Sequence, residues 1–303
     1  MAAFLRPRAI PPKPRVALVA PSGPIAEERL GPAVEGLERA GFRVVRRPDP
    51  DARLGFLAAS DEHRAAELEG AVRDPSVDLV WCVRGGYGAT RILERLDADV
   101  FRRARKPFVG YSDATALLLW QLRVAELVGI HGPMLERGEP PRSDELDCLR
   151  SLLGGGLPAP LSGCEGEGEA VEGELVGGSL TLLAASLGTP FEVETGGRIL
   201  LLEEVAEAPY RVDRCLQQLE AAGKLREVRG VGVGQLTRCE GSPEEPAALE
   251  VVRDRLRRLG LPFVLGLPFG HGIPNLPWPV GVSARLEPGR GRLVLTEPAV
   301  EGA

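Results

Sequence analysis

The stretch KPFVGYSDATALLLW, residues 106–120, decides the fold of the first half of the chain. Residues 107–111 read as an apolar strand, and an apolar helix follows Ser112 without an intervening loop. Continuous apolar strands that alternate with helices are typical of a parallel β-sheet covered by helices on both faces. The stretch also raises the question of why a small polar side chain stands at so sharp a corner.

The sequence before and after this corner repeats the same alternation. Further strands are expected at residues 15–20, 42–45, 77–83 and 126–130. Helices are expected at residues 26–41, 61–74 and 89–96. Ser60 is the expected N-cap of the second of these helices, and Gly41 follows the first as a C-terminal glycine would. The first half therefore predicts an α/β domain.

The second half mixes strands and helices less regularly. Strands are expected at 198–205 and 228–236, and helices after the glycines at 177–178, at 210–223 and from Ser242 to near Gly260. Residues 279–298 alternate on both sides of a Pro-Gly turn and predict a hairpin. The segment between is rich in Gly, Pro and acids. We expect an N-terminal domain at 1–135, a linker with one short helix at 136–170 and a C-terminal domain at 171–303.

Composition excludes several classes of function. The 303 residues carry a net charge of −6 with a pI near 5.4, which argues against a nucleic-acid partner. No apolar run approaches the length of a membrane span or a signal peptide. The five cysteines are scattered and form no CxxC pair, which favours the cytoplasm. The histidines show no metal-binding spacing, so we expect neither metal nor cofactor.

Two polar, glycine-containing corners follow strands of the expected parallel sheet. They are RGGYG at 84–88 and GYSDA at 110–114. Ligands bind beyond the carboxyl ends of such strands. A serine at a strand-to-helix turn is placed where backbone amides favour developing negative charge, although Ser112 could instead only cap its helix. RGGYG matches no phosphate loop, but Gly85 or Gly86 would let a backbone N–H approach a ligand closely.

A nucleophilic serine needs a base and an orienting carboxylate. Of the three histidines, His63 lies in a surface helix, whereas His131 and His271 stand in loops, and spacing alone does not choose between the last two. The carboxylate candidates close an apolar strand or follow it; they are Glu203, Glu204 and Glu207. The residues thus allow a Ser…Glu…His order, an arrangement that recurs on unrelated folds.

Seven stretches in order resemble the L,D-carboxypeptidase family of serine peptidases, which includes the muramoyl-tetrapeptide carboxypeptidases. They span residues 16–286 and read VALVAPSGPI, RGGYGATRIL, KPFVGYSDATALL, GIHGPM, GGSLTLLAASLGTP, ILLLEEVAEAPYRVDR and GLPFGHGIPNLPWPVGVSARL. The resemblance implies a flavodoxin-like N-terminal domain, a smaller β/α C-terminal domain, an active site between them and a homodimer. It also implies release of the terminal D-Ala from murein tetrapeptides during cell-wall recycling.

The resemblance assigns roles to individual residues. Ser112 maps to the nucleophile, Glu203 to the triad carboxylate and His271 to the base. The backbone amides of Gly86 and Asp113 map to the oxyanion hole. EEV stands where many relatives have Glu-Asp, a change that keeps the second acid.

The substrate-binding residues and the exact substrate stay open at the level of the sequence. Arg84, with its neighbours Gly85 and Tyr87, is the candidate for gripping the substrate's terminal carboxylate, although a structural ion pair would explain the arginine equally well. Within the same family, an immunity peptidase acting on microcin-type peptidyl nucleotides is an alternative. A binding protein without turnover would lack a triad member, and all three are present here.

Overall fold

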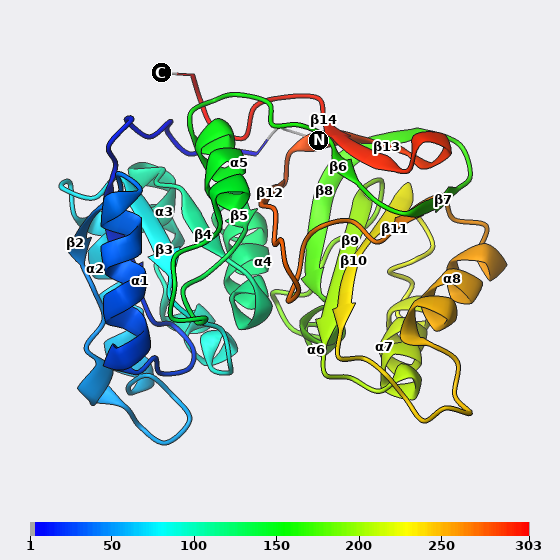
Figure 1. Ribbon diagram of the computed structural model, residues 1–303, viewed down its shortest axis with the longest axis horizontal. Coiled ribbons are helices and arrows are strands. Elements are labelled where there is room, and N and C mark those ends of the chain that lie inside the picture. Colours follow the sequence, from blue (N-terminus) through cyan, green and yellow to red (C-terminus); the bar gives the residue numbers. More distant parts are fainter. Residues whose placement is uncertain (1–3, 303) are drawn as a thin grey trace. The chain divides into compact units, whose positions relative to one another are not determined.

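The computed structural model describes residues 4–302, which divide into two compact units. Unit 1 contains the chain up to Gly156 together with Pro277–Pro279 and the segment from Ala299 onward. Unit 2 contains Leu157–Leu276 and Val280–Pro298. Figure 1 shows the helices and strands of each unit. Within the described residues, no helix combines the length and apolar character needed to cross a membrane.

Unit 1 is built on a six-stranded sheet with the order β12-β5-β4-β3-β1-β2. Its strands are β1 (Arg15–Val19), β2 (Arg43–Arg46), β3 (Leu79–Cys82), β4 (Phe108–Gly110), β5 (Gly129–His131) and β12 (Trp278–Val280). The pairs among β1 to β5 are all parallel. Reading β2-β1-β3-β4-β5 gives the flavodoxin-like order, so the predicted fold class of the first half is confirmed.

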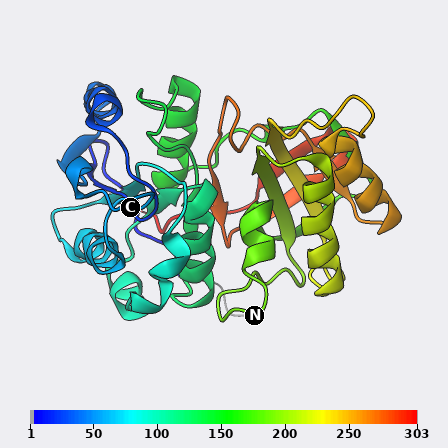
Figure 2. The ribbon, with the colours of Figure 1, turned by 90° about the horizontal axis from the view of Figure 1, so that it is seen from below.

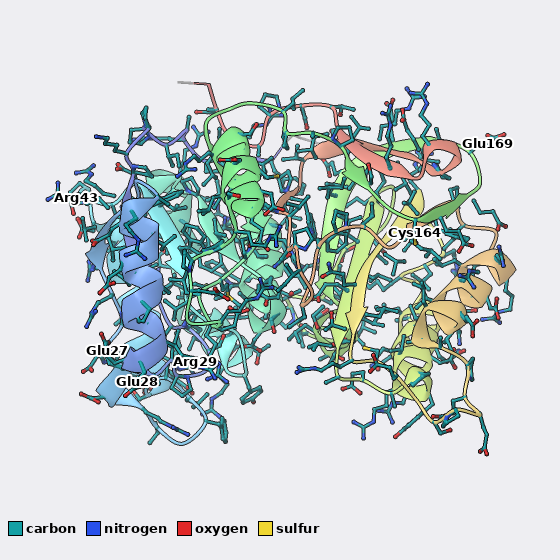
Figure 3. The ribbon with its side chains drawn as sticks, viewed as in Figure 1. Glu27, Glu28, Arg29, Arg43, Cys164 and Glu169 are labelled. Atoms are coloured by element: carbon teal, nitrogen blue, oxygen red, sulfur yellow. The ribbon has the colours of Figure 1, made fainter. Side chains whose placement is uncertain are left out.

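Helices cover both faces of this sheet. They are α1 (Glu27–Arg39), α2 (Asp61–Arg73), α3 (Ala98–Ala104), α4 (Thr115–Arg123) and α5 (Ser143–Leu153). Figure 2 shows α1 and α5 on one face and α2, α3 and α4 on the other. The acids in the first turn of α1, Glu27 and Glu28, complement the helix dipole and lie on the surface (Figure 3). As expected, Ser60 caps α2 by accepting a hydrogen bond from the His63 amide.

Unit 2 is built on an eight-stranded mixed sheet with the order β6-β14-β13-β8-β9-β10-β11-β7. Its strands are β6 (Leu161–Ser162), β7 (Glu165–Glu167), β8 (Val171–Ser179), β9 (Ile199–Val205), β10 (Gly230–Thr237), β11 (Phe263–Leu265), β13 (Ser283–Glu287) and β14 (Arg292–Leu295). The four strands β8 to β11 are parallel neighbours. The expected hairpin is the antiparallel pair β13 and β14. The helices are α6 (Leu180–Ala185), α7 (Pro209–Ala221) and α8 (Ala248–Arg258). Unit 2 is thus the expected β/α domain.

Three local predictions are wrong for physical reasons. The helix expected at 89–96 is two short 3₁₀ turns, η2 (Ala89–Arg91) and η3 (Leu93–Arg95). This segment is short, and tertiary hydrogen bonds fix it: the Ala89 amide donates to Asp113 and Arg91 binds Asp61. The other two concern the start of α8 and the glycines before α6.

Prolines and close packing explain these two differences. The helix expected from Ser242 begins only at Ala248, because Pro246 disfavours the helical conformation of the residue before it. Gly177 and Gly178 belong to β8 rather than to a turn. A Cβ at Gly177 would lie 1.9 Å from the Leu201 carbonyl oxygen, so the strands approach there as only glycine permits. In the segment expected as a linker, the structure has α5, β6 and β7.

Candidate active site

The serine corner of unit 1 follows directly from the end of β4. Ser112 has φ 58°, a left-handed conformation that is strained for a residue with a side chain. It begins the 3₁₀ turn η4 (Ser112–Ala114), and α4 starts right after it. Its hydroxyl caps neither helix. The interpretation of Ser112 as only a helix cap is therefore wrong, and the strained corner instead presents a half-buried hydroxyl at the carboxyl end of the sheet.

Glycines make room for this corner. A Cβ at Gly85 would lie 2.8 Å from both Cβ and Oγ of Ser112 and 3.3 Å from the Asp113 amide nitrogen. The Gly85 carbonyl accepts a hydrogen bond from the Gly23 amide at 2.9 Å. Gly86 has φ 103°, which also favours glycine. The RGGYG loop therefore lies against Ser112, as the positions of the two corners on neighbouring strands β3 and β4 predicted.

The side chain of Asp113 fixes the loop that follows these glycines. Its Oδ2 accepts the Ala89 amide at 2.8 Å. Burial raises the pKa of the Asp113 carboxyl, and this hydrogen bond opposes the shift. The carboxyl of Asp113 therefore has a structural partner in the Ala89 amide. The backbone amide of Asp113, in contrast, lies beside the contact between Ser112 and Gly85.

Tyr87 and Arg84 extend outward from the same loop. Tyr87 is 49% exposed, and its ring lies 5.6 Å, centroid to centroid, from that of Phe56, which is 65% exposed. The Arg84 guanidinium donates to the Pro24 carbonyl at 2.6 Å. Among the described residues it has no carboxylate partner, so the structural ion pair considered as its alternative role is absent.

The candidate base of unit 2 stands in the loop between β11 and β12. Nδ1 of His271 lies 2.6 Å from Oε2 of Glu203. Glu203 is on β9 and fully buried, and the His271 side chain is 15% exposed. Because an ionised carboxylate can only accept, the proton on Nδ1 faces Glu203 and the Nε2 lone pair is the basic site of the ring.

The three candidate carboxylates have different partners in the structure. Glu203 and Glu204 are consecutive in a strand and so point to opposite faces of the sheet. Glu204 accepts the Thr181 amide of α6 at 2.6 Å and the Val205 amide at 2.9 Å, and burial raises its pKa. Glu207 pairs with Arg211 at 3.4 Å. Only Glu203 among the three contacts a histidine.

The other histidines have different surroundings. His131 is fully buried in unit 1, where its ring stacks on Trp278 with centroids 4.9 Å apart and meets the edge of Tyr111. His63 lies exposed in the first turn of α2. The choice between His131 and His271 that spacing left open therefore falls on His271 as the histidine bound to a carboxylate.

Two further side chains hold the histidine loop, and the sequence reasoning did not single them out. Oδ1 of the buried Asn275 accepts the Gly270 amide at 2.9 Å. Gln235 on β10 accepts the Gly272 amide at 2.7 Å and donates to the Pro274 carbonyl at 3.0 Å. The amides on both sides of His271 are thus fixed. A polar residue among the apolar positions of β10 was the available signal for Gln235.

The glycine before the histidine allows the close approach to Glu203. A Cβ at Gly270 would lie 3.0 Å from both Cβ and Oε2 of Glu203. Gly270 also has φ 117°. The described residues contain no group of three or more His, Cys, Asp or Glu side chains that could hold a metal ion.

Comparison with known proteins identifies the family of the chain. Residues 16–132 match the model of the LD-carboxypeptidase N-terminal domain, and residues 172–286 match that of the C-terminal domain. A putative carboxypeptidase of Streptomyces coelicolor is 39% identical over 99% of this chain and 99% of its own length. The murein tetrapeptide carboxypeptidase of Pseudomonas aeruginosa is 33% identical over 92% of this chain and 94% of its own length.

Solved structures resemble the chain over nearly its whole length. The muramoyltetrapeptide carboxypeptidase of Oxalobacter formigenes has a TM-score of 0.84 at 30% identity, covering 94% of this chain and 99% of its own. The microcin C7 self immunity protein MccF has a TM-score of 0.90 over 98% of this chain and 100% of its own, but at 23% identity the likeness is one of fold. The chain therefore belongs to the LD-carboxypeptidase family of peptidases and is a hydrolase of that family.

Proposed function

We propose that the chain is a serine-type L,D-carboxypeptidase that releases the terminal D-Ala from murein tetrapeptides. The observation that carries this proposal is the 2.6 Å pairing of His271 with the buried Glu203. It is the arrangement that prepares an imidazole to accept a proton from a hydroxyl nucleophile. The names of the relatives from Pseudomonas aeruginosa and Oxalobacter formigenes support the substrate class.

The first half of the reaction forms an acyl-enzyme. Ser112 Oγ attacks the amide carbonyl at the L,D-bond while His271 Nε2 takes the hydroxyl proton. Glu203 keeps the ring in the required tautomer and stabilises the imidazolium that forms. This step requires Oγ and Nε2 to come within hydrogen-bonding distance when substrate is bound.

Backbone amides stabilise the tetrahedral intermediate. The Gly86 and Asp113 amides, which belong to the two segments that meet at Ser112, donate to the oxyanion. Loss of one such donor costs roughly a hundredfold or more in rate. His271 then protonates the leaving nitrogen of D-Ala. A water, deprotonated by the same histidine, hydrolyses the ester and restores Ser112.

Arg84 is the proposed partner of the substrate's terminal carboxylate. One of its guanidinium nitrogens binds Pro24, which holds the side chain, and no carboxylate in the described part of the chain neutralises it. The remaining N–H groups of a guanidinium fork match a carboxylate. Gly85 and Tyr87 follow Arg84 in the same loop.

The test is release of D-Ala from purified L-Ala-D-Glu-meso-diaminopimelate-D-Ala, followed by mass spectrometry. We expect the tetrapeptide to be cleaved and the analogue ending in L-Ala to stay intact, because the carboxylate and methyl group of the wrong enantiomer exchange places. An enzyme that cleaves both equally, or neither, would contradict the assignment. A pentapeptide ending in D-Ala-D-Ala serves as the control for bond type.

A second candidate is a peptidase that acts on aminoacyl-sulfamoyl nucleotides. The exposed ring pair Phe56–Tyr87 beside the serine loop favours it, because exposed aromatic faces can stack on a ring of the substrate. Structures of MccF contain such compounds, including glutamyl sulfamoyl guanosine. A side-by-side assay distinguishes the two, since the preferred substrate class will show the higher kcat/KM.

We also propose a cytoplasmic role in recycling murein peptides, carried out by a homodimer. All five cysteines are unpaired, which suits a reducing compartment. Fractionation of the producing cells tests the location. Light scattering after gel filtration tests the dimer, for which we expect about twice the monomer mass of 32.4 kDa.

A further inference from the structure

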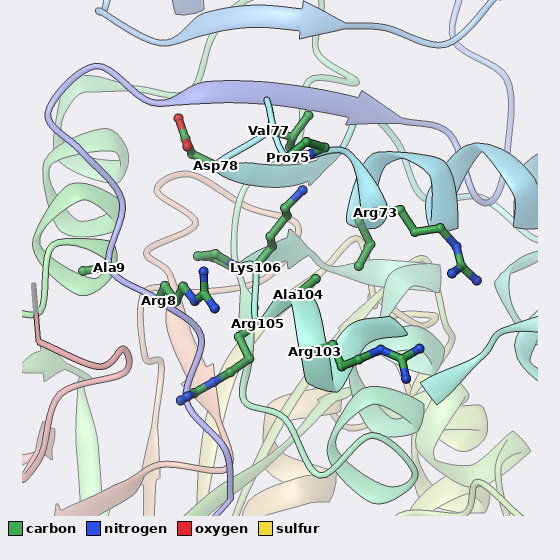
Figure 4. A pocket seen from close by; sticks show the side chains of 12 residues that line it. Arg8, Ala9, Arg73, Pro75, Val77, Asp78, Arg103, Ala104, Arg105 and Lys106 are labelled. Carbon is green, nitrogen blue, oxygen red and sulfur yellow. The ribbon is translucent and has the colours of Figure 1, made fainter. Parts of the chain in front are cut away.

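A cavity of about 340 Å³ lies in unit 1 at the end of the sheet opposite to Ser112. Asp78, which directly precedes β3, and Lys106 and Pro107, which directly precede β4, are among its lining residues, whereas Ser112 follows the carboxyl end of β4. Positive side chains dominate its lining (Figure 4); they are Arg8, Arg73, Arg103, Arg105 and Lys106. Because the whole chain carries a net charge of −6, this gathering does not follow from composition.

The one acid in the lining does not neutralise this cluster. Both carboxylate oxygens of Asp78 bind the Arg15 side chain, at 2.9 and 3.1 Å. Arg15 holds the pKa of the Asp78 carboxyl below its usual range, so Asp78 stays charged and remains bound to Arg15. The carboxylate therefore adds no free negative charge to the cavity.

Three of the five cations have structural partners. Arg73 binds Glu69 at 3.0 Å, and Arg105 pairs with Glu301. The ammonium of Lys106 donates to backbone carbonyls at the carboxyl end of α2, at 3.2 Å to that of Ala71 and also to that of Asp74. Such contacts complement the helix dipole, so these three residues would be explained without a ligand.

Arg8 and Arg103 are not explained in this way. Both are exposed, and neither guanidinium has a hydrogen-bond or carboxylate partner within the described part of the chain. They come from separate segments, Arg8 from the N-terminal arm and Arg103 from α3, and they line one cavity with Lys106. Two donors of the Lys106 ammonium are used, and one of its three remains.

We propose that this cavity binds a small multivalent oxyanion of the phosphate class. A ligand with several oxygen atoms and more than one charge suits a cavity that is lined, from three segments of the chain, by two uncompensated guanidinium groups and an ammonium group. The volume of about 340 Å³ is large enough for a pyrophosphate or a small phosphate ester. Because Lys106 and Ser112 stand at opposite ends of the three-residue strand β4, the site is separate from the proposed catalytic corner.

Isothermal titration of the full-length protein with sodium pyrophosphate in low-salt buffer tests this proposal. We expect saturable binding with one site per chain and an affinity that falls as salt is added. Arg8→Ala and Arg103→Ala should each weaken binding about tenfold, the loss expected for one charge-assisted hydrogen bond. Both variants should keep their melting temperature within about 2 °C, because surface guanidiniums without partners contribute little to stability.

The control is Arg226→Ala, which removes an exposed arginine side chain of unit 2 whose guanidinium has no partner in the described residues. It should bind pyrophosphate as the wild type does. Absence of saturable heat, or equal affinity of wild type and the Arg8→Ala/Arg103→Ala double variant, would overturn the site. Tighter binding of citrate than of pyrophosphate would overturn the phosphate assignment.

Discussion

The serine corner of unit 1 is formed mainly by backbone, whereas the histidine loop of unit 2 is held by side chains. Around Ser112 the controlling features are its own φ of 58° and the glycines at 85 and 86. Around His271 they are the carboxylate of Glu203 and the amides of Asn275 and Gln235. In the proposed mechanism Ser112 needs a fixed backbone position beside N–H donors, and His271 needs a fixed ring orientation. Each region thus controls the property that its proposed role requires.

Ser112 gives the largest expected effect and tests the first half of the comparison. Ser112→Ala should lower kcat by about 10⁴-fold or more, because no other hydroxyl replaces the nucleophile. Ser112→Gly should be equally inactive but more stable than Ser112→Ala by about 1 kcal/mol, since glycine adopts a positive φ without strain. D-Ala release and urea unfolding measure the two quantities. Equal stability of the two variants would show that the corner stores no strain.

Glu203 and Glu204 provide a matched pair in the histidine region. Glu203→Gln should lower kcat about 10⁴-fold, because an amide no longer selects the tautomer with its proton on Nδ1. Glu204→Gln, on the next residue and the opposite face, should stay within a few fold of wild type. Steady-state kinetics with the tetrapeptide as substrate measures kcat for both variants. If the two variants lose activity equally, the carboxylate assignment is wrong.

Gly85→Ala tests whether backbone space positions the serine. The added Cβ would lie 2.8 Å from Ser112 Cβ and Oγ, so the corner must shift. A displacement of this kind costs about a hundredfold in kcat, and overpacking costs about 1–3 kcal/mol of stability. The control is Gly289→Ala, since no atom lies within 4 Å of the Cβ it would add. Unchanged kcat in Gly85→Ala would mean that the loop adapts freely.

Most of the fold and half of the site follow from the sequence. The unbroken apolar strand and the helix after Ser112 are local signals, so the corner and the parallel sheet could be predicted. The choice among Glu203, Glu204 and Glu207 could not, because it depends on which face of β9 meets the histidine loop. That contact joins residues 68 positions apart, and no local pattern records it.

Two of the three errors in the fold have the same origin in nonlocal contacts, whereas the late start of α8 follows from the local effect of Pro246. Residues 89–96 have a helical apolar pattern, yet hydrogen bonds to Asp113 and Asp61 close them into 3₁₀ turns. Gln235 and Asn275 were overlooked because single amides carry no periodic signal. The resemblance to a family supplied the roles of Glu203 and His271 that spacing alone left open.

Glu204 gives the smallest expected effect, on stability. Burial raises its pKa above the ordinary value of 4.5, so the folded state binds the proton more tightly than the unfolded chain does. Its contribution to stability is therefore complete at pH values below about 4.5 and is lost as the pH rises through the raised pKa. As the pH rises from about 4.5 through the raised pKa, the unfolding free energy of Glu204→Gln should fall less than that of the wild type. A parallel decline in both proteins would exclude Glu204 as its source.

The proposed mechanism requires Ser112 and His271 to act as one catalytic group. A double-mutant cycle on kcat/KM for D-Ala release measures this most directly, using Ser112→Ala, His271→Ala and the double variant. The account predicts that the double variant is no slower than the worse single variant, because removing either member already abolishes nucleophilic attack. Multiplicative losses, or a His271→Ala enzyme that retains near wild-type activity, would contradict it.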